Sequence, residues 1–476
     1  MTKFIKSLFL VCFIVVAFVA CVEKQTNSVC GIIPTETPAR PAGQTHVVGL
    51  TADPIETVRV GVIGLGMRGP HAVQRFVHID RVEVVALCDL HLERVERVNA
   101  RLVENGQPEA AVYYGEDGWK ELVRRDDLDL IYIAADWRRR GEMIVYAVEN
   151  GKHVATEHPG ATTMEEIWNI INAAEKHRKH VMLLANIVYS NFELTTLNMV
   201  QQGVFGEVLY AEGAYIHQLV PYWDSYEGDW RIKENRRMRG DIYPIHGIGS
   251  AALALNINRG DRMTHLVSMD TRPVSIPNWL NETRGENLSH THEDFANGQN
   301  TMTLIQTANG RAINLHRDVA SLRPYSRMYA VQGTNGYLQG FPRQGISLIG
   351  SKLYELTGNP ELANSNGKTW LSDEVRNELL TKFRHPILTD EMQETASRLS
   401  AIAHGGADFI MDYRLIYCLR HGLPLDMNVY DLAAWSSMVP LTAVSLENNS
   451  SPVEIPDFTR GYWDYLKGVN MALSTD

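Results

Sequence analysis

The chain has 476 residues, of which 45% are hydrophobic and 21% are charged, and its formal net charge at pH 7 is −11. This length exceeds what one hydrophobic core usually supports, so we expect two domains. The negative charge and the lack of any basic run argue against nucleic acid as a partner, because binding to a phosphate backbone relies on clustered lysine and arginine.

The N-terminus carries the one strongly apolar segment of the sequence. Lys3 and Lys6 precede an apolar run that ends at Ala20, and Cys21 follows directly. A basic head, about a dozen apolar residues and a small residue at the end are typical of a secretory signal rather than of a membrane span. We therefore expect residues 1–20 to be a signal peptide and the protein to be exported. Cys21 resembles the lipidated cysteine of a bacterial lipobox, which implies a periplasmic or outer-membrane lipoprotein; the alternative is a plain cleaved signal.

The other cysteines give no sign of a metal site or of a disulfide framework. Cys30, Cys88 and Cys418 are scattered, so we interpret the last two as small buried hydrophobic residues. His290 and His292 have a spacing that some metal sites use, but no third cluster of ligands lies nearby in the sequence. We expect no bound metal.

The first long section of the chain predicts a nucleotide-binding fold. Residues 21–57 are rich in Thr, Pro, Glu and Gln without apolar periodicity, which predicts a flexible tether. From Val58, short apolar runs alternate with longer amphipathic ones, as in βαβ units on a parallel sheet, so residues 58–185 are expected to form a Rossmann domain. The predicted strands are Val58–Ile63, Val82–Cys88, Leu128–Ala134, His153–Thr156 and Val181–Ala185, and the predicted helices are Leu92–Val103, Glu142–Asn150 and Met164–His177.

Residues 186–476 have a different rhythm. Several strands alternate in period two, and Asn309-Gly310 between two of them favours a hairpin turn. This predicts an α+β domain with a large, open, mostly antiparallel sheet and C-terminal helices, so that the chain as a whole is of the α/β class. The predicted strands are Val208–His217, Leu266–Asp270, Asn300–Thr307, Arg311–Arg317 and Met328–Gly333, and the predicted helices are Phe192–Gln202, Glu391–Ala401, Ala407–Leu419 and Val429–Leu446.

A glycine motif follows the first predicted strand. Gly64 allows a tight turn, Gly66 lets the backbone approach a pyrophosphate, and Gly69 allows close packing of the next helix on the sheet. Asp89 ends the second strand, twenty residues after Gly69, where a carboxylate binds the adenosine ribose and repels a 2′-phosphate. The motif therefore favours NAD over NADP as the cofactor; the alternative is a glycine-rich turn in an empty Rossmann-like domain.

A second motif, Glu157-His158-Pro159, ends the strand predicted at His153–Thr156. It resembles the Glu-Lys-Pro motif of the Gfo/Idh/MocA oxidoreductase superfamily, which faces the nicotinamide. In the sugar dehydrogenases of that superfamily the lysine handles the proton of the reacting hydroxyl group. His158 replaces this lysine here, so we expect Glu157 and His158 mainly to line the nicotinamide pocket.

A wider set of motifs resembles the NAD-dependent α-N-acetylgalactosaminidases of glycoside hydrolase family 109. The motifs are Gly213–His217, Trp230–Lys233, Tyr243–Gly247, Asn256–Met263, Arg323–Arg327 and His404–Phe409. The resemblance implies NAD contacts at Met67, Arg68, Asp89, Trp137, Arg138, Arg139, Arg140, Glu157, His158 and Asn186, and sugar contacts at Tyr215, Arg231, Tyr243, Pro244, Ile245, His246 and Tyr325. The family reads Trp-x-Trp-His where this chain has Trp137 to Arg140, which puts the detailed cofactor contacts in question.

The resemblance implies hydrolysis through a transient ketone at carbon 3 of the sugar, which acidifies the proton on carbon 2 and allows the leaving group to depart by elimination. His246 is the candidate base for the hydroxyl proton, since imidazole titrates near neutrality, and Tyr243 lies in the same turn. Tyr189 is the candidate base at carbon 2. The alternatives are a structural His246 bonded to a backbone carbonyl and a Tyr189 ring that only packs.

The role of His404 and Asp408 stays open in the sequence. His404 and Asp408 are four residues apart at a predicted helix start, where the aspartate favours the helix dipole and caps the helix.

The expected partner is a small-molecule or glycan substrate, and a homo-oligomer is left open. A NAD-dependent sugar dehydrogenase and a sugar-binding module with vestigial cofactor use are the alternative functions; a glycosidase releases aglycone without net NADH, a dehydrogenase accumulates NADH, and a binding module does neither.

Overall fold

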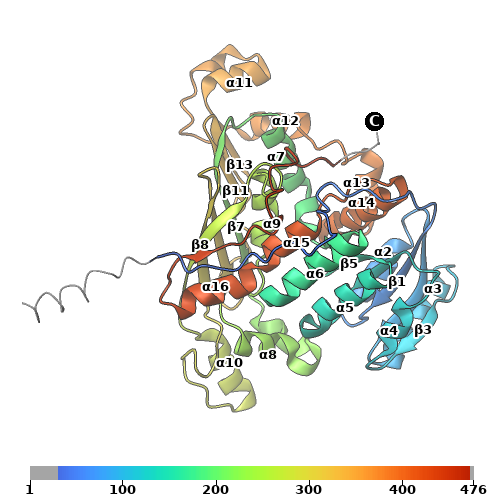
Figure 1. The fold of residues 1–476 in the computed structure, drawn as a ribbon. Coiled ribbons are helices and arrows are strands. Elements are labelled where there is room, and N and C mark those ends of the chain that lie inside the picture. Colours follow the sequence, from blue (N-terminus) through green and yellow to red (C-terminus); the bar gives the residue numbers. More distant parts are fainter. Residues whose placement is uncertain (1–30, 472–476) are drawn as a thin grey trace, which may run out of the picture.

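We analysed a computed structural model of the chain, which describes residues 31–471. The predicted signal peptide and Cys21 lie outside the described residues. Two α/β layers face each other, each built on its own sheet (Figure 1). Within the described part, no helix is both long enough and apolar enough to cross a membrane.

The N-terminal sheet is fully parallel and has the strand order β3-β2-β1-β4-β5-β6. The central strands are apolar throughout because helices cover both faces of the sheet. This confirms the predicted Rossmann domain, and the carboxyl ends of its strands form one edge of the sheet. The strands are β1 (Val58–Ile63), β2 (Val82–Asp89), β3 (Ala111–Tyr114), β4 (Leu130–Ile133), β5 (His153–Thr156) and β6 (Val181–Leu183), and the helices are α2 (Gly69–Phe76), α3 (Leu92–Glu104), α4 (Gly118–Val123), α5 (Trp137–Glu149) and α6 (Met164–His177).

The second sheet has eight strands in the order β13-β12-β11-β7-β10-β9-β8-β14. All neighbouring pairs are antiparallel except β7 and β10, which confirms the predicted mostly antiparallel sheet. The strands are β7 (Val208–Ile216), β8 (Met263–Asp270), β9 (Asn300–Thr307), β10 (Ala312–Asp318), β11 (Ala330–Gly333), β12 (Gly336–Gln339), β13 (Gly345–Leu348) and β14 (Val453–Glu454).

One face of this sheet is covered by α9 (Ile245–Ala254) and α16 (Met438–Glu447). A Cβ atom on Gly213 of β7 would lie 1.9 Å from the carbonyl oxygen of Gly247, so the close approach of α9 to β7 requires glycine. This contact fixes the first turn of α9, which carries His246. Buried and accessible side chains alternate along β9 because the opposite face of the sheet is open, as predicted.

The remaining helices complete the second half of the chain. They are α7 (Asn191–Gln201), α8 (Trp230–Arg237), α10 (Ser275–Arg284), α11 (Gly350–Thr357), α12 (Asp373–Lys382), α13 (Asp390–Arg398), α14 (Ala407–His421) and α15 (Val429–Ser436). The single helix predicted at Val429–Leu446 is in fact two, α15 and α16. Pro440 in the first turn of α16 has no N–H to continue a helical hydrogen-bond ladder from α15, which explains the break.

The C-terminal helices connect the two sheets. Helix α14 contacts α2 and β1 of the Rossmann domain, and α15 contacts α6 and β6. Figure 1 shows these late helices, in orange and red, beside the green helices α5 and α6. As a consequence, the segment before α14 lies against the glycine turn that follows β1.

Residues 31–57 pack against the body of the protein, so the prediction of a flexible tether is wrong for this stretch. Arg40 donates to Glu175 of α6 at 3.0 Å, and the main-chain N–H of Val47 donates to the Tyr430 hydroxyl of α15 at 3.0 Å. Leu50 is buried in the core. The polar composition of the segment suggested a tether because only a few of its residues make these buried contacts.

Candidate active site

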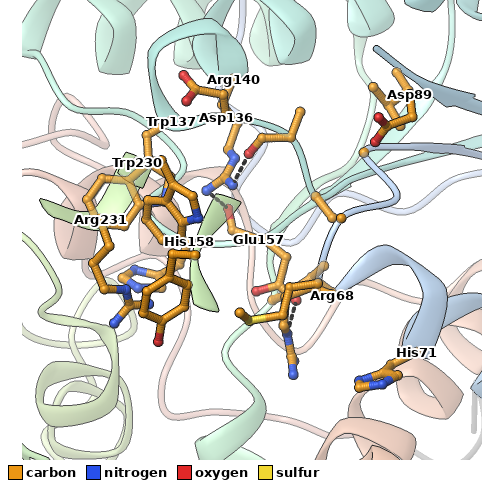
Figure 2. Close-up of a pocket in the computed structure, with 18 of the residues that line it drawn as sticks. Arg68, His71, Asp89, Asp136, Trp137, Arg140, Glu157, His158, Trp230 and Arg231 are labelled. Atoms are coloured by element: carbon orange, nitrogen blue, oxygen red, sulfur yellow. Dashed lines mark hydrogen bonds and ion pairs between the residues drawn. The ribbon is translucent and has the colours of Figure 1, made fainter. Parts of the chain in front are cut away.

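A cavity of about 1070 Å³ runs between the edge of the parallel sheet and the second domain. Asp89 lies at one end, and Trp137, His158, Trp230 and Arg231 gather at the other, with Arg68 and Glu157 between them (Figure 2). The cavity therefore joins the predicted dinucleotide site to the predicted sugar site.

The glycine turn has the geometry that a dinucleotide needs. Gly64 has a φ of +94°, and a Cβ atom there would lie 2.6 Å from the Ala134 carbonyl group. A Cβ atom on Gly69 would lie 1.9 Å from the Gly64 carbonyl oxygen, so both positions require glycine. Gly66 lines the cavity. The backbone can thus approach a pyrophosphate closely at the start of α2, and the residues fit NAD.

Asp89 holds this turn from the next strand. Its Oδ2 accepts from the N–H of Leu65 at 2.7 Å, and its Oδ1 accepts from the N–H of His91 at 3.1 Å. The residue is 7% exposed and lines the cavity. Asp89 therefore shapes the turn as well as facing the position expected for the ribose.

Arg68 connects the glycine turn to two other segments of the chain. Its Nε donates to Glu157 at 3.0 Å, and its Nη2 donates to Asp408 at 2.8 Å. Burial acts to lower the pKa of Arg68, but the two carboxylates outweigh it and raise that pKa. Met67 is half exposed on the cavity wall. Arg68 is thus a permanently charged link between both domains at the middle of the cavity.

The side chains from Trp137 to Arg140 do not all line the cavity. Trp137 lies 5.2 Å from the ring of Trp230 and lines the cavity, as does Arg139. Arg138 instead donates to Glu234 at 2.7 Å and is not part of the cavity wall, which corrects its expected NAD contact. Of the three arginines at this place in the motif, Arg139 and Arg140 line the cavity and Arg138 does not.

Arg140 is buried at the cavity wall and clamps the turn after β5. Its Nη1 donates to the carbonyl oxygens of Glu157 at 2.9 Å and of Pro159 at 2.8 Å, and its Nη2 donates to that of Ala135. Because burial outweighs the nearby negative charges, its pKa falls to about 10, at which it is still charged at neutral pH. Asn186 of the 3₁₀ helix η1 (Asn186–Tyr189) completes this wall.

The sugar end of the cavity is lined by aromatic rings. The ring of Tyr243 lies 3.8 Å from that of His158 and 4.9 Å from that of Tyr215, and Tyr215 lies 4.7 Å from His246. Burial lowers the pKa of His158 and His246 and raises the pKa of Tyr215 and Tyr243. At neutral pH these groups are therefore uncharged imidazoles and protonated phenols.

Arg231 lies within this aromatic group. Its guanidinium carbon is 4.7 Å from the ring centre of Tyr226, 5.0 Å from that of Trp230 and 5.1 Å from that of Tyr243. The residue is 9% exposed, and none of the described carboxylates forms an ion pair with it. The guanidinium also interacts with the Tyr215 hydroxyl group, but its Nε is buried without a hydrogen-bond partner among the described residues, so it retains donors for a ligand.

Three other expected sugar contacts have different positions. Ile245 lines the cavity, whereas Pro244 is the buried N-cap of α9 and is not part of the wall. Tyr325 also lies outside the wall, but its ring is 5.2 Å from that of His217, which lines the cavity. Tyr325 is thus at the rim. His246 Nδ1 is buried without a hydrogen-bond partner among the described residues, so the alternative of a carbonyl-bonded structural histidine is not what the structure shows.

The structure contradicts the expectation that Tyr189 is the base at carbon 2. The structure places it in the hydrophobic core, outside the cavity wall, with its hydroxyl group donating to Asp426 at 3.0 Å. Burial and the neighbouring carboxylate raise its pKa, the opposite of what a base requires. Its place three residues after Asn186 suggested a site residue, but one turn of 3₁₀ helix directs it away from the cavity.

His404 and Asp408 lie at a helix start, as expected, and Asp408 is in the first turn of α14, but it does not cap the helix. Gly406, not Asp408, is the N-cap of α14, and Asp408 bonds to His404 and Arg68 instead of capping the helix. His404 lines the cavity, as do His71 and His217, which the sequence analysis did not assign. The family-like motif around His404 was the one signal that could have pointed to it.

Within residues 31–471 there is no group of three or more side chains able to hold a metal ion. His290 bonds to Asn278, and His292 bonds to the carbonyl oxygen of Ala296. Both histidines are used in local loop contacts.

These features define an NAD-binding enzyme of the Gfo/Idh/MocA type with a carbohydrate-processing domain. Residues 58–184 match the model described as oxidoreductase family, NAD-binding Rossmann fold, and residues 189–465 match the model described as glycosyl hydrolase 109, C-terminal domain. The chain belongs to glycosyl hydrolase family 109. Its cofactor is NAD.

Relatives match over nearly the whole chain. The chain is 50% identical to glycosyl hydrolase family 109 protein 1 of Bacteroides fragilis (strain YCH46) over 464 residues, 97% of this chain and 98% of the relative. It is 50% identical to a family 109 protein of Porphyromonas gingivalis over 444 residues, 93% of each chain.

Solved structures share the fold at low identity. Myo-inositol dehydrogenase from Lactobacillus casei, in complex with NAD(H) and myo-inositol, has a TM-score of 0.55 and 18% identity, covering 85% of this chain and 99% of that one. Levoglucosan dehydrogenase in complex with NADH has a TM-score of 0.61 and 16% identity, covering 84% and 99%.

Proposed function

We propose that this enzyme is a NAD-dependent glycosidase that releases terminal α-N-acetylgalactosamine, or a related sugar, by oxidation, elimination, addition of water and reduction. The observation that carries the proposal is the continuous cavity from the glycine turn and Asp89 to the ring-lined sugar end at His246. One substrate can lie there with its ring against the nicotinamide position.

The carboxylates of the cavity wall argue against a conventional hydrolysis by two acidic residues. Glu157 is bound by Arg68, Asp136 accepts the N–H of Arg138 at the start of α5, and Asp89 is bound by the glycine turn. The paired-carboxylate mechanism needs one free acid and one free base or nucleophile on either side of the glycosidic bond. These three carboxylates are instead used in structural contacts.

NAD, when bound, supplies the reversible removal of a hydride from carbon 3 of the sugar. His246, neutral because burial lowers its pKa, can accept the proton of the carbon 3 hydroxyl group. The protonated phenols of Tyr215 and Tyr243 can donate hydrogen bonds to the sugar oxygens, including the enolate oxygen that forms when carbon 2 loses its proton. Arg231 can donate to a hydroxyl or acetamide oxygen.

Hydrolysis in deuterium oxide tests the proposal. The released sugar should carry deuterium at carbon 2, while the hydrogen on carbon 3 should return without exchange. His246→Ala should slow aglycone release by about a hundredfold or more, the scale of a lost general acid or base, and should keep NAD affinity. Hydrolysis without deuterium at carbon 2, seen by mass and proton spectra, would refute the redox route.

A sugar dehydrogenase is the second candidate, and the structural likeness to sugar and inositol dehydrogenases favours it. A screen of nitrophenyl glycosides that follows dye release and NADH absorbance together separates the two functions. Dye release without net NADH supports the glycosidase, and NADH accumulation without dye supports the dehydrogenase.

We also propose that the protein is exported and anchored by a lipid on Cys21. The basic head, the apolar run and the position of Cys21 directly after Ala20 support this proposal. Cys21→Ser should shift the protein from the detergent phase to the aqueous phase in detergent partitioning. Equal partitioning of both forms after confirmed signal cleavage would contradict the anchor.

A further inference from the structure

The segment before α14 places an imidazole and a carboxylate together at the cavity. His404 lines the cavity, and its Nδ1 lies 2.6 Å from Oδ2 of Asp408. The Asp408 side chain is 0% exposed, and its second oxygen accepts from Arg68. Arg68 Nη1 is also 3.1 Å from the same imidazole nitrogen, but the shorter contact with an ionised acceptor assigns the hydrogen of Nδ1 to Asp408. The lone pair of the imidazole is then on Nε2.

The backbone around His404 is held in an unusual shape. His404 has a φ of +44°, and Gly405 and Gly406 follow with φ values of +70° and +101°. A left-handed conformation at a residue other than glycine is strained and is often found at functional sites. A Cβ atom on Gly406 would lie 2.7 Å from Cβ of Ala396, so packing against α13 maintains the turn.

His404 differs from the buried imidazoles of the cavity in two ways. Its side chain is 56% exposed, so water can reach it, and its Nδ1 is paired with the Asp408 carboxylate. His158 and His246 have pKa values well below the usual range because of burial, and neither is paired with a carboxylate among the described residues. Among these three imidazoles, His404 is therefore the one that combines a carboxylate partner with access to water.

We propose that His404, oriented by Asp408, is the base that removes the proton from carbon 2 of the sugar. This inference rests on the proposed redox glycosidase function and fills the position that Tyr189 cannot take. Nε2 takes the proton of carbon 2, and the electron pair of that C–H bond enters the enolate of the carbon 3 ketone. The enolate then re-forms the ketone while the bond between carbon 1 and the leaving oxygen breaks, and the imidazolium protonates that oxygen. Water adds its oxygen to carbon 1 and a proton to carbon 2.

His404→Gly is the variant that tests this role, because glycine favours the left-handed backbone and leaves room for added imidazole. On mixing with substrate, the variant should still form NADH in a single turnover, since oxidation at carbon 3 does not need His404. Aglycone release and deuterium uptake at carbon 2 should both fall by about a hundredfold or more. Added imidazole should restore part of both rates. His290→Gln, which changes a partly buried loop histidine outside the cavity wall, is the control.

The outcomes separate the inference from the function on which it rests. If the wild-type enzyme takes up no deuterium at carbon 2, the proposed function fails. If the wild type exchanges and His404→Gly exchanges equally fast, or if the variant binds NAD but no longer forms NADH, the base role is overturned. Loss of exchange without rescue by imidazole would make His404 a positioning residue and would also overturn the proposal. NAD affinity and the melting temperature of the variant verify that it is folded.

Discussion

The hydroxyl group of Tyr189 donates to Oδ2 of Asp426 over 3.0 Å, and both side chains are buried. Asp426 also accepts from Nε and Nη2 of Arg414 at 2.9 and 2.7 Å. The shared carboxylate therefore ties η1, directly beyond Asn186 of the cavity wall, to α14.

This relationship predicts a structural effect for Tyr189→Phe. The variant should lower the free energy of unfolding by about 1–2 kcal/mol, because Asp426 loses one buried donor. It should not show the roughly hundredfold loss of turnover that removal of a catalytic base causes. Urea unfolding and steady-state hydrolysis measure the two effects. A hundredfold loss of turnover with normal stability would contradict the structural role and would indicate that Tyr189 takes part in catalysis.

The parallel sheet and the glycine turn were predictable because their signals are local. The apolar run at Val58–Ile63, the glycines from Gly64 to Gly69 and the carboxylate of Asp89 follow one another at fixed spacing, and the structure places them as predicted. Strand β3 was missed since it is a four-residue strand at the sheet edge with alternating burial.

The cavity wall was less predictable, because it depends on contacts between distant segments. Whether Arg138 or Arg140 faces inward depends on Glu234 and on the carbonyl groups after β5, which are not adjacent in sequence. Arg68 and Asp408, which are hydrogen-bonded to each other, are 340 residues apart in the sequence. The resemblance indicated the right motifs, but it did not indicate which of their side chains reach the cavity.

Arg231 is predicted to bind substrate by its fork of donors. Arg231→Lys should raise KM by about tenfold or more, which corresponds to about 1.4 kcal/mol, because a single ammonium group cannot match a planar guanidinium stacked among three rings. Arg284→Lys is a matched control, since Arg284 stacks on Trp279 at 5.2 Å but pairs with exposed carboxylates. KM values for a nitrophenyl glycoside provide the measurement; equal effects of both variants would contradict a ligand role for Arg231.

Buried histidines predict acid sensitivity of the Rossmann domain. Burial lowers the pKa of His153 to about 4 and of His180 to about 3, against 6.5 in an unfolded chain. The unfolded state therefore binds more protons below pH 6.5, so stability is full above that pH and is lost as the pH falls toward 4. The urea midpoint should drop across this range.

His180→Phe tests the cause of this acid sensitivity. Nε2 of His180 is buried without a partner among the described residues, so a phenyl ring removes a titrating group without orphaning a hydrogen-bond partner of that atom. The variant should have a flatter dependence of the urea midpoint on pH than the wild type. His290→Phe, at a partly buried loop position of the second domain, should keep the wild-type slope. An unchanged slope in His180→Phe would assign the acid sensitivity to other groups.

Arg140 is predicted to affect NAD affinity indirectly, by holding main-chain segments of the cofactor site in place. Its guanidinium group ties Ala135 after β4 to Glu157 and Pro159 after β5, at the strand ends where the nicotinamide is expected. Arg140→Lys keeps the charge but places all donors on one nitrogen, which cannot reproduce the fork by which two guanidinium nitrogens bond to carbonyl groups on both strands. We expect the Kd for NAD to rise by about tenfold, or about 1.4 kcal/mol. Fluorescence titration with NAD measures this change, and Arg124→Gln, which changes an exposed arginine of the same domain, is the control. A lower melting temperature with an unchanged Kd would show that the clamp stabilises the fold without shaping the cofactor site. A higher Kd at an unchanged melting temperature would show that the turn after β5 is held in place mainly for the cofactor.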